Sequence, residues 1–253
     1  MTKVLVTGGA GFIGSCLTAR LLKQGHHVVV LDNFSTGSTT SLKDSITNPR
    51  FECVRTDLRD DTILRKILRD CTMVYHLAAN SNVRKGTKDT SVDFEQNLVG
   101  TRVLLECMRE SANCRRIVFT STSTVYGDGT QRKSYLYVDD CLEALLIAGT
   151  LKQNEPEVFN VGSSDSVAVT EVLRIIGSVL GQRVNGNVEF KDNGDGRGWR
   201  GDVREMMLDC SKLKGRGWKV RYDSRAAIET TVTRFLRTNT FEIGSDIRVA
   251  SLT

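Results

Sequence analysis

Several common signatures are missing from this chain of 253 residues, and each absence excludes a class of protein. No apolar run is long enough to cross a bilayer, and the glycine-rich start is typical of a strand and turn rather than a signal peptide. Lys and Arg outnumber Asp and Glu by 35 to 30, but they are scattered rather than clustered. We therefore expect no membrane and no nucleic acid as partner, although the positive excess could serve an anionic small ligand.

The chain also lacks paired cysteines and a metal-binding pattern. Its seven cysteines include no C-x-x-C pair, which argues against a zinc or redox motif and favours a reducing compartment, the cytoplasm. Cys16, Cys107 and Cys141 fall in helix-like apolar patterns and are expected to be small buried hydrophobic residues. No carboxylate or second histidine stands at ligand spacing from His76, so we expect this histidine to pack at a strand end and the protein to hold no metal.

What the first half does contain is a regular alternation of apolar runs and amphipathic stretches. We expect strands at residues 3–6, 28–31, 51–55, 73–77 and 116–120, and helices at 12–24, 62–69 and 96–110. Fully apolar strands separated by helices predict an α/β fold, a doubly wound parallel-sheet Rossmann fold covered on both faces.

The alternation fails after Gly127. Short strands are expected at 135–138 and 158–161, helices at 140–150, 169–180 and 224–237, and a loop at the glycine- and charge-rich stretch 186–201. The sequence therefore predicts a Rossmann domain over residues 1–127 and a second part over residues 128–253.

A glycine-rich turn follows the first strand and opens the first helix, over Thr7 to Gly14. Gly8 permits the tight turn, Gly11 lets a pyrophosphate approach the backbone, and Gly14 lets the helix pack closely. The helix N-terminus then offers free N–H groups to the phosphates. Asp32, at the end of the second strand, can accept hydrogen bonds from ribose hydroxyls and would repel a 2′-phosphate, which favours NAD over NADP. The alternatives are a glycine turn that only packs and an aspartate that only caps its strand.

Further motifs follow this turn in a fixed order. They are Asp32-Asn33-Phe34-Ser35-Thr36-Gly37, Asp57-Leu58, His76-Leu77-Ala78-Ala79, Asn97 with Gly100-Thr101, the block from Thr120 to Gly127, the block from Gly127 to Gln131, Tyr137 to Asp140, and Phe159 to Gly162. With the T-G-x-x-G-x-x-G turn, this set resembles the extended short-chain dehydrogenases, and within them the NAD-dependent nucleotide-sugar epimerases and dehydratases, nearest to the UDP-glucose 4-epimerases. The resemblance covers nearly the whole chain and implies that residues 128–253 are the last Rossmann elements with a reduced C-terminal substrate-binding lobe.

This resemblance implies NAD as cofactor and a nucleotide-diphosphate sugar, expected to be a UDP-sugar, as substrate. Cofactor contacts are expected from Gly8, Gly11, Phe12, Ile13, Gly14, Asp32, Asn33, Ser35, Thr36, Gly37, Asp57, Leu58, Leu77, Ala78, Ala79, Asn97 and Thr120. Substrate contacts are expected from Arg132, Lys133 and Arg200, for which an ordinary solvated charge is an equal alternative. The family often has arginine where Lys133 stands, and lysine binds phosphate as a point charge rather than a fork.

The family's chemistry needs a tyrosine that, as phenolate, removes a sugar hydroxyl proton while hydride passes to NAD. A lysine four residues later lowers the pKa of that tyrosine, and a Ser or Thr, here Thr122, holds the hydroxyl. None of the five tyrosines in this chain has lysine four residues later, so we expect the catalytic pair to be absent. The blocks that meet at Gly127 lie far apart in the family, so the segment between them, including a helix that helps form the family's dimer interface, is expected to be missing.

Three hypotheses about function remain open. The chain is a catalytically impaired UDP-glucose 4-epimerase-like protein, or a non-catalytic NAD-binding module that pairs with an intact relative, or an extended reductase of another substrate class. The block of residues 127–131 with Lys133 favours a diphosphate ligand and so opposes the third. A homodimer is expected to be weakened if the interface helix is missing.

Overall fold

The computed structural model describes residues 2–82, 88–121, 132–151, 155–181 and 205–238. The chain divides into two compact units, residues 1–122 and residues 123–253. Unit 1 contains a five-stranded sheet, and unit 2 contains a three-stranded sheet. Within the described ranges, no helix is both long and apolar enough to cross a membrane. The predicted boundary at residue 127 falls outside these ranges.

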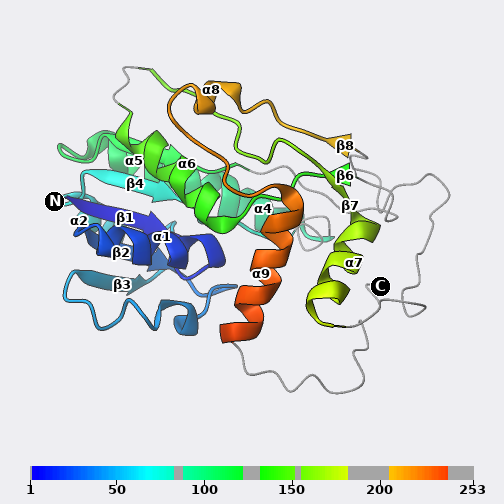
Figure 1. Ribbon diagram of the computed structural model, residues 1–253. Coiled ribbons are helices and arrows are strands. Elements are labelled where there is room, and N and C mark those ends of the chain that lie inside the picture. Colours follow the sequence, from blue (N-terminus) through cyan, green and yellow to red (C-terminus); the bar gives the residue numbers. More distant parts are fainter. Residues whose placement is uncertain (1, 83–87, 122–131, 152–154, 182–204, 239–253) are drawn as a thin grey trace. The chain divides into compact units, whose positions relative to one another are not determined.

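All strands of the sheet in unit 1 are parallel, and their order is β3-β2-β1-β4-β5 (Figure 1). They are β1 (Lys3–Thr7), β2 (His27–Asp32), β3 (Phe51–Arg55), β4 (Met73–His76) and β5 (Arg116–Phe119). The chain moves outward from β1 to β3 and then crosses back to β4, so the order reverses between β1 and β4. Open α/β sheets bind ligands beyond the carboxyl ends of the strands at such a reversal. The predicted α/β Rossmann fold is confirmed.

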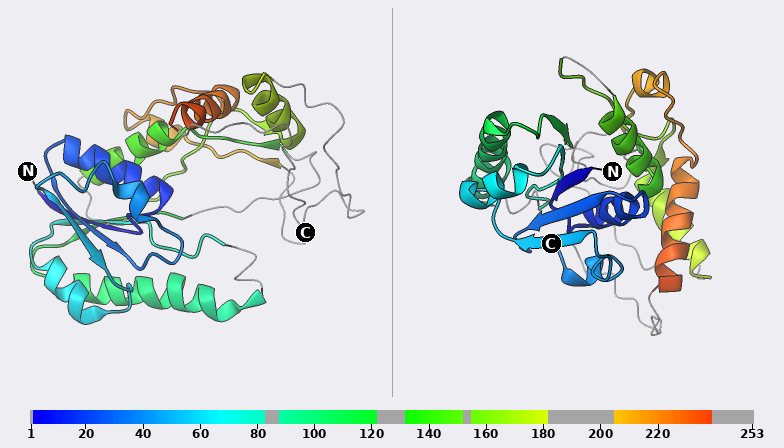
Figure 2. Two further views of the ribbon diagram at one scale, coloured as in Figure 1. Left: turned by 90° about the horizontal axis from the view of Figure 1, so that it is seen from below. Right: turned by 90° about the vertical axis from the view of Figure 1, so that its left-hand side faces the viewer.

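Helices cover both faces of this sheet (Figure 2). One face carries α1 (Phe12–Lys23), whose Leu17 and Leu21 are buried. The opposite face carries α2 (Asp61–Leu68) and α5 (Gly100–Glu110). Because side chains alternate along a strand, a strand buried on both faces must be apolar throughout, which is why the strand runs were readable in the sequence.

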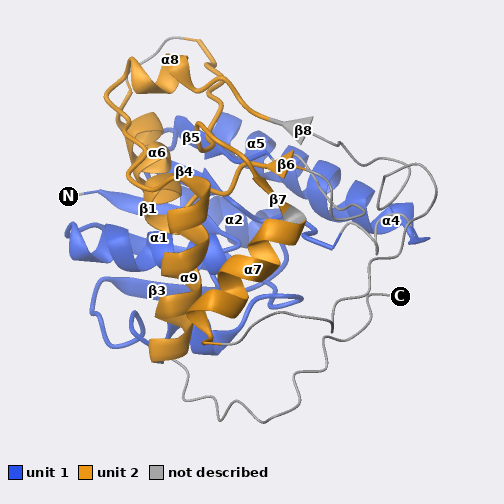
Figure 3. Cartoon of the chain, turned by 45° about the vertical axis from the view of Figure 1, so that its right-hand side comes forward, with its two compact units in different colours: residues 1–122 blue, residues 123–253 orange. Residues whose placement is uncertain are grey.

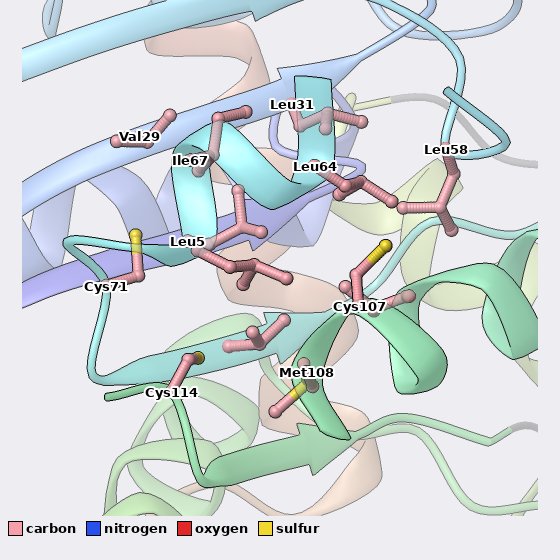
Figure 4. Close-up of a cluster of buried hydrophobic side chains, with 13 residues drawn as sticks. Leu5, Val29, Leu31, Leu58, Leu64, Ile67, Cys71, Cys107, Met108 and Cys114 are labelled. Atoms are coloured by element: carbon pink, nitrogen blue, oxygen red, sulfur yellow. The ribbon is translucent and has the colours of Figure 1, made fainter. Parts of the chain in front are cut away.

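The face under α2 and α5 is a continuous apolar core (Figure 4). Leu5 of β1 and Val29 of β2 meet Leu64 of α2 and Leu104 of α5, and all four side chains are fully buried. Burying one such side chain is worth about 1.5–3 kcal/mol. This layer therefore holds the central strands, and with them the loops at their carboxyl ends, in place.

None of the seven cysteines forms a disulfide. Cys107 is buried in the core, as predicted, but Cys16 and Cys141 are only partly buried. Burial raises the pKa of the Cys71 thiol to about 12, which keeps it protonated and unreactive.

The helix expected at 96–110 begins earlier and is not uniform. It starts as α4 (Thr90–Asp93), continues as the π-helix η2 (Phe94–Val99) and ends as α5. Asp89 caps the start, since its side chain accepts a hydrogen bond from the Ser91 backbone N–H. The sequence prediction missed this cap and the change of helix type.

Unit 2, orange in Figure 3, contains short strands in the order β7-β6-β8 and four helices within its described residues. The elements are β6 (Arg132–Lys133), α6 (Val138–Thr150), β7 (Val167–Ala168), α7 (Val169–Val179), β8 (Glu205–Met206), α8 (Ser211–Lys214) and α9 (Ser224–Thr238). Trp218 is buried with Ala144 and Leu213 in one cluster, and Ile175 of α7 is buried with Ile228 of α9 in another.

Two predicted strands of this unit are wrong. Residues 135–138 form no strand, because the strand lies earlier, at Arg132–Lys133, and Val138 already begins α6. The acidic pair after Val138 favours a helix N-terminus at this point. Residues 158–161 pair with no strand, although Phe159 and Val161 pack against the Trp218 cluster. The apolar pattern at residues 158–161 therefore reflects burial of the side chains and not hydrogen bonding to a neighbouring strand.

We expect Asp140→Ala to lower the free energy of unfolding of unit 2 by about 2 kcal/mol, because backbone donors lose their acceptor. The Asp140 side chain is fully buried, and its Oδ2 accepts the backbone N–H groups of Arg221 at 3.0 Å and Tyr222 at 3.3 Å. Urea unfolding followed by Trp218 fluorescence, in a Trp199→Phe background, measures the loss. Glu143→Ala on the same helix removes only a partly exposed ion pair and should change stability little; equal losses in both variants would contradict the assignment.

Candidate functional site

A cavity of about 410 Å³ lies in unit 1. Its lining contains every predicted cofactor residue except Asn97: Gly8, Gly11, Phe12, Ile13, Gly14, Asp32, Asn33, Ser35, Thr36, Gly37, Asp57, Leu58, Leu77, Ala78, Ala79 and Thr120. It also contains Gly100, which the sequence placed in a family motif, and residues that the sequence did not single out: Leu31, Thr56, Ser81, Glu95 and Gln96. The loops that follow β1, β2, β3 and β4 meet here, together with the first residue after β5.

The glycine turn forms one wall because its backbone is packed too tightly for side chains. Gly8 has φ of 68°, and a Cβ there would lie 2.7 Å from the backbone N of Ala78. A Cβ on Gly14 would collide with the carbonyl oxygen of Gly8. The helix α1 begins directly after Gly11, so its free N–H groups and positive dipole end open at the turn. The arrangement suits a phosphate group.

Asp32 has a structural role as well as a place in the cavity wall. Its Oδ2 accepts the backbone N–H of Ala10 at 2.9 Å, and its Oδ1 accepts that of Phe34 at 2.8 Å. The carboxylate therefore ties the glycine turn to the loop after β2. Each oxygen keeps a second lone pair for a ligand hydroxyl. Phe34 has φ of 58°, a left-handed conformation that its bond to Asp32 helps to hold.

A chain of polar contacts runs along another part of the lining. Arg59 donates to Asp57 at 2.8 Å and to Glu95 at 2.7 Å, and Asn33 donates to Asp57 at 3.2 Å. These bonds, that of Arg59 first, lower the pKa of Asp57 to about 2. Asp57 is therefore a charged and oriented acceptor at neutral pH.

Asn97 lies next to the cavity rather than in its lining. Its Oδ1 accepts the backbone N–H of Asn80 at 2.7 Å, and its Nδ2 donates to Asp93 at 3.1 Å. His76 is buried between the hydroxyls of Thr7 and Thr101, at 2.7 and 2.9 Å. Burial lowers the pKa of His76 to about 4, so its ring is neutral at pH 7.

The structure describes only two of the four residues predicted to bind substrate or take part in catalysis. Arg132 is exposed and donates to the carbonyl of Ser166 at 2.7 Å, while Lys133 is buried in β6. Thr122 and Arg200 lie outside the described residues. Among the residues that are described, no group of three or more His, Cys, Asp or Glu side chains could hold a metal ion.

A family model described as the NAD dependent epimerase/dehydratase family matches residues 4–133 and 124–162 of this chain. The chain belongs to this family. The predicted membership and the predicted cofactor of the family, NAD, are thereby confirmed.

Individual relatives agree with this assignment. The chain is 25% identical to a putative UDP-glucose 4-epimerase of Methanocaldococcus jannaschii over 311 aligned positions, which cover 90% of this chain and 97% of the relative. It is 40% identical to a UDP-glucose 4-epimerase of Halalkalibacterium halodurans over 130 residues, which cover 51% of this chain but 37% of that protein. A crystal structure of a UDP-galactose 4-epimerase matches with a TM-score of 0.76 and 29% identity, over 94% of this chain and 99% of the other.

We predict that His76 makes the stability of unit 1 depend on pH. Its pKa is 6.5 in the unfolded chain and about 4 in the folded protein, so between these values the unfolded chain binds a proton that the folded protein does not. The free energy of unfolding is therefore complete above pH 6.5 and should fall by about 3 kcal/mol as pH approaches 4. The pKa of Asp57 is about 2, so its protonation affects stability only below the range from pH 4 to pH 6.5.

Urea titrations across this pH range measure the effect. His76→Gln should flatten the slope, and His27→Gln, at an exposed histidine, should keep it. A slope that is unchanged in His76→Gln would show that other groups cause the pH dependence.

Proposed function

We propose that this chain is an NAD-binding, UDP-glucose 4-epimerase-like family member that does not perform the family's proton abstraction efficiently. The observation that carries the proposal is a cavity lined by all but one of the residues expected to contact the cofactor, in a chain without a Tyr-x-x-x-Lys pair. Two of the described tyrosines, Tyr75 and Tyr135, are poorly suited to replace the tyrosine of that pair. Burial raises the pKa of Tyr75 to about 12 and also raises that of Tyr135, which is the opposite of what a phenolate base requires.

The comparisons support the absence of a middle segment. The family model matches two stretches that overlap on residues 124–133, as expected when two blocks have been brought together. The alignment to the Methanocaldococcus jannaschii relative has 311 positions, more than the 253 residues of this chain. Part of that relative therefore has no counterpart here. The missing part would contain the catalytic tyrosine and lysine.

A UDP-sugar is the substrate class that this proposal implies. The curated relatives named above are UDP-glucose 4-epimerases, and Arg132, Lys133 and Arg200 are the cations proposed to face the diphosphate. Thr122 is proposed to hold the sugar hydroxyl. A homodimer, if it forms, should be weak without the missing helix.

The second candidate is a non-catalytic NAD-binding module that pairs with an intact relative. Phe94, Leu98 and Leu105 favour it, because these large apolar side chains along η2 and α5 are 55%, 60% and 47% exposed. Residual turnover separates the candidates, because an impaired enzyme retains a slow reaction whereas the module has none by itself.

The first test is calorimetric titration with NAD and NADP. We expect NAD to bind more tightly, because Asp32 accepts ribose hydroxyls and repels a 2′-phosphate. Asp32→Ala should cost about 1–3 kcal/mol of NAD binding. Asp70→Ala removes an exposed carboxylate that is not part of the cavity lining and is the control. Equal or tighter binding of NADP would refute the cofactor assignment. Unchanged NAD affinity in Asp32→Ala would show that Asp32 only joins the glycine turn to the loop after β2.

The second test is turnover. Purified protein is incubated with NAD and UDP-glucose, and UDP-galactose is followed by chromatography. We expect no useful interconversion, since a general base contributes about 10²–10⁴-fold and lost positioning of the sugar adds to the deficit. Turnover of roughly one per second, an ordinary enzymatic rate, would contradict the proposal and show that another group replaces the missing tyrosine.

A further inference from the structure

A row of hydrogen bonds beside the cavity links the end of β1 to η2. The backbone N–H of Ala78 donates to Oγ1 of Thr7 at 3.3 Å, and this hydroxyl lies 2.7 Å from Nδ1 of His76. Nε2 of His76 lies 2.9 Å from Oγ1 of Thr101, whose hydroxyl donates to the carbonyl of Asn97 at 2.6 Å. The three side chains of the row, those of Thr7, His76 and Thr101, each have a partner on both sides.

The hydroxyl hydrogens of the two threonines determine which ring nitrogen is protonated. Thr101 gives its hydrogen to Asn97, so it can only accept from Nε2 of His76, which must carry a hydrogen. Thr7 accepts from Ala78 and keeps its own hydrogen for Nδ1. At pH 7 the ring is neutral, and this single tautomer satisfies all the bonds.

Among the described residues, three side chains form a hydrogen bond or a ring contact with His76. They are Thr7 of β1, Thr101 of α5 and Phe119 of β5, whose ring centroid is 5.4 Å away. None of the three is ionisable near neutral pH. Burial alone accounts for the lowered pKa of His76, so the hydrogen-bond row persists across the neutral range.

The helix at the end of the row is wound more loosely than an α-helix. The backbone N–H of Gly100 donates to the carbonyl of Glu95, five residues earlier. Such π-turns are rare in proteins, and those that do occur are often found at functional sites. The bond from the Thr101 side chain to the carbonyl of Asn97, four residues earlier, is of a kind that bends helices. Two residues of this turn, Glu95 and Gln96, line the cavity.

We infer that His76 is a positioning residue for the cofactor site. Its Nε2–H orients the Thr101 hydroxyl onto the Asn97 carbonyl and so holds η2 in the register that presents Glu95 and Gln96 to the cavity. His76 is absent from the cavity lining, so it acts on the site through Thr101. The inference rests on the proposed NAD site, but all bonds of the hydrogen-bond row join protein atoms.

The test combines hydrogen exchange over residues 94–101, followed by mass spectrometry, with calorimetric NAD titration. We expect His76→Leu and Thr101→Val each to speed exchange in this segment and to weaken NAD binding about 10-fold, the effect of one buried hydrogen bond. The double variant should be no worse than either single variant, because both break the same row. His76→Gln should restore part of the affinity, since its amide can donate to Thr101.

Val74→Ala is the matched control, because it removes packing from the same strand without touching the row. It should lower stability but leave exchange over 94–101 and NAD affinity unchanged. The same local effect in Val74→Ala, or wild-type exchange and affinity in Thr101→Val, would overturn the inference. Thr101→Val keeps the test decisive if His76→Leu does not fold. Failure of the unaltered protein to bind NAD would refute the proposed function, and the exchange measurement would still decide the role of His76.

A spectroscopic measurement checks the tautomer itself. In long-range ¹H–¹⁵N correlation spectra of protein labelled at histidine, we expect Nε2 of His76 to be protonated and Nδ1 to be unprotonated at neutral pH. His76→Gln assigns the signal among the three histidines. Protonation at Nδ1 would exchange the donor and acceptor roles of the two ring nitrogens and would overturn the inference.

Discussion

The close approach of two backbone segments, the glycine turn and the chain that leaves β4, is the constraint on which the site depends. A side chain on Gly8 would meet the backbone at Ala78, so only glycine allows both segments to line one cavity. The approach occurs between β1 and β4, where the strand order reverses. The last residues of these two strands are Thr7 and His76. Their side chains form a hydrogen bond that joins the strands next to the cavity.

The polar groups of the lining are held in place by other groups of the protein. Asp32 is fixed by backbone donors on two loops, and Asp57 is fixed and kept ionised by Arg59. The N-terminus of α1 adds a positive dipole end. A ligand that offers hydroxyl groups as well as negative charge meets both kinds of group without reorganising the protein, which lowers the cost of binding.

The residues expected to bind the cofactor and those expected to perform the chemistry lie in different segments of the family's chain, and we propose that this protein has only the first. The cavity is assembled by loops after the strands of unit 1, within residues 8–120. The base and its lysine belong to a segment that this chain is proposed to lack. A protein of this kind would still hold the cofactor, whereas turnover of a sugar requires a base positioned within hydrogen-bond reach.

The sequence by itself determined the parallel sheet, the glycine turn and most of the cavity lining, because these depend on local patterns such as the apolar run of β2 and the spacing of Gly8, Gly11 and Gly14. It failed at residues 135–138, where the apolar pattern suits either a strand or the start of a helix. Only the tertiary structure decided the places of Glu95 and Gln96. Their direction depends on one extra residue in a helical turn, and that turn is supported by His76, which is distant in sequence and adjacent only after β4 has joined the sheet.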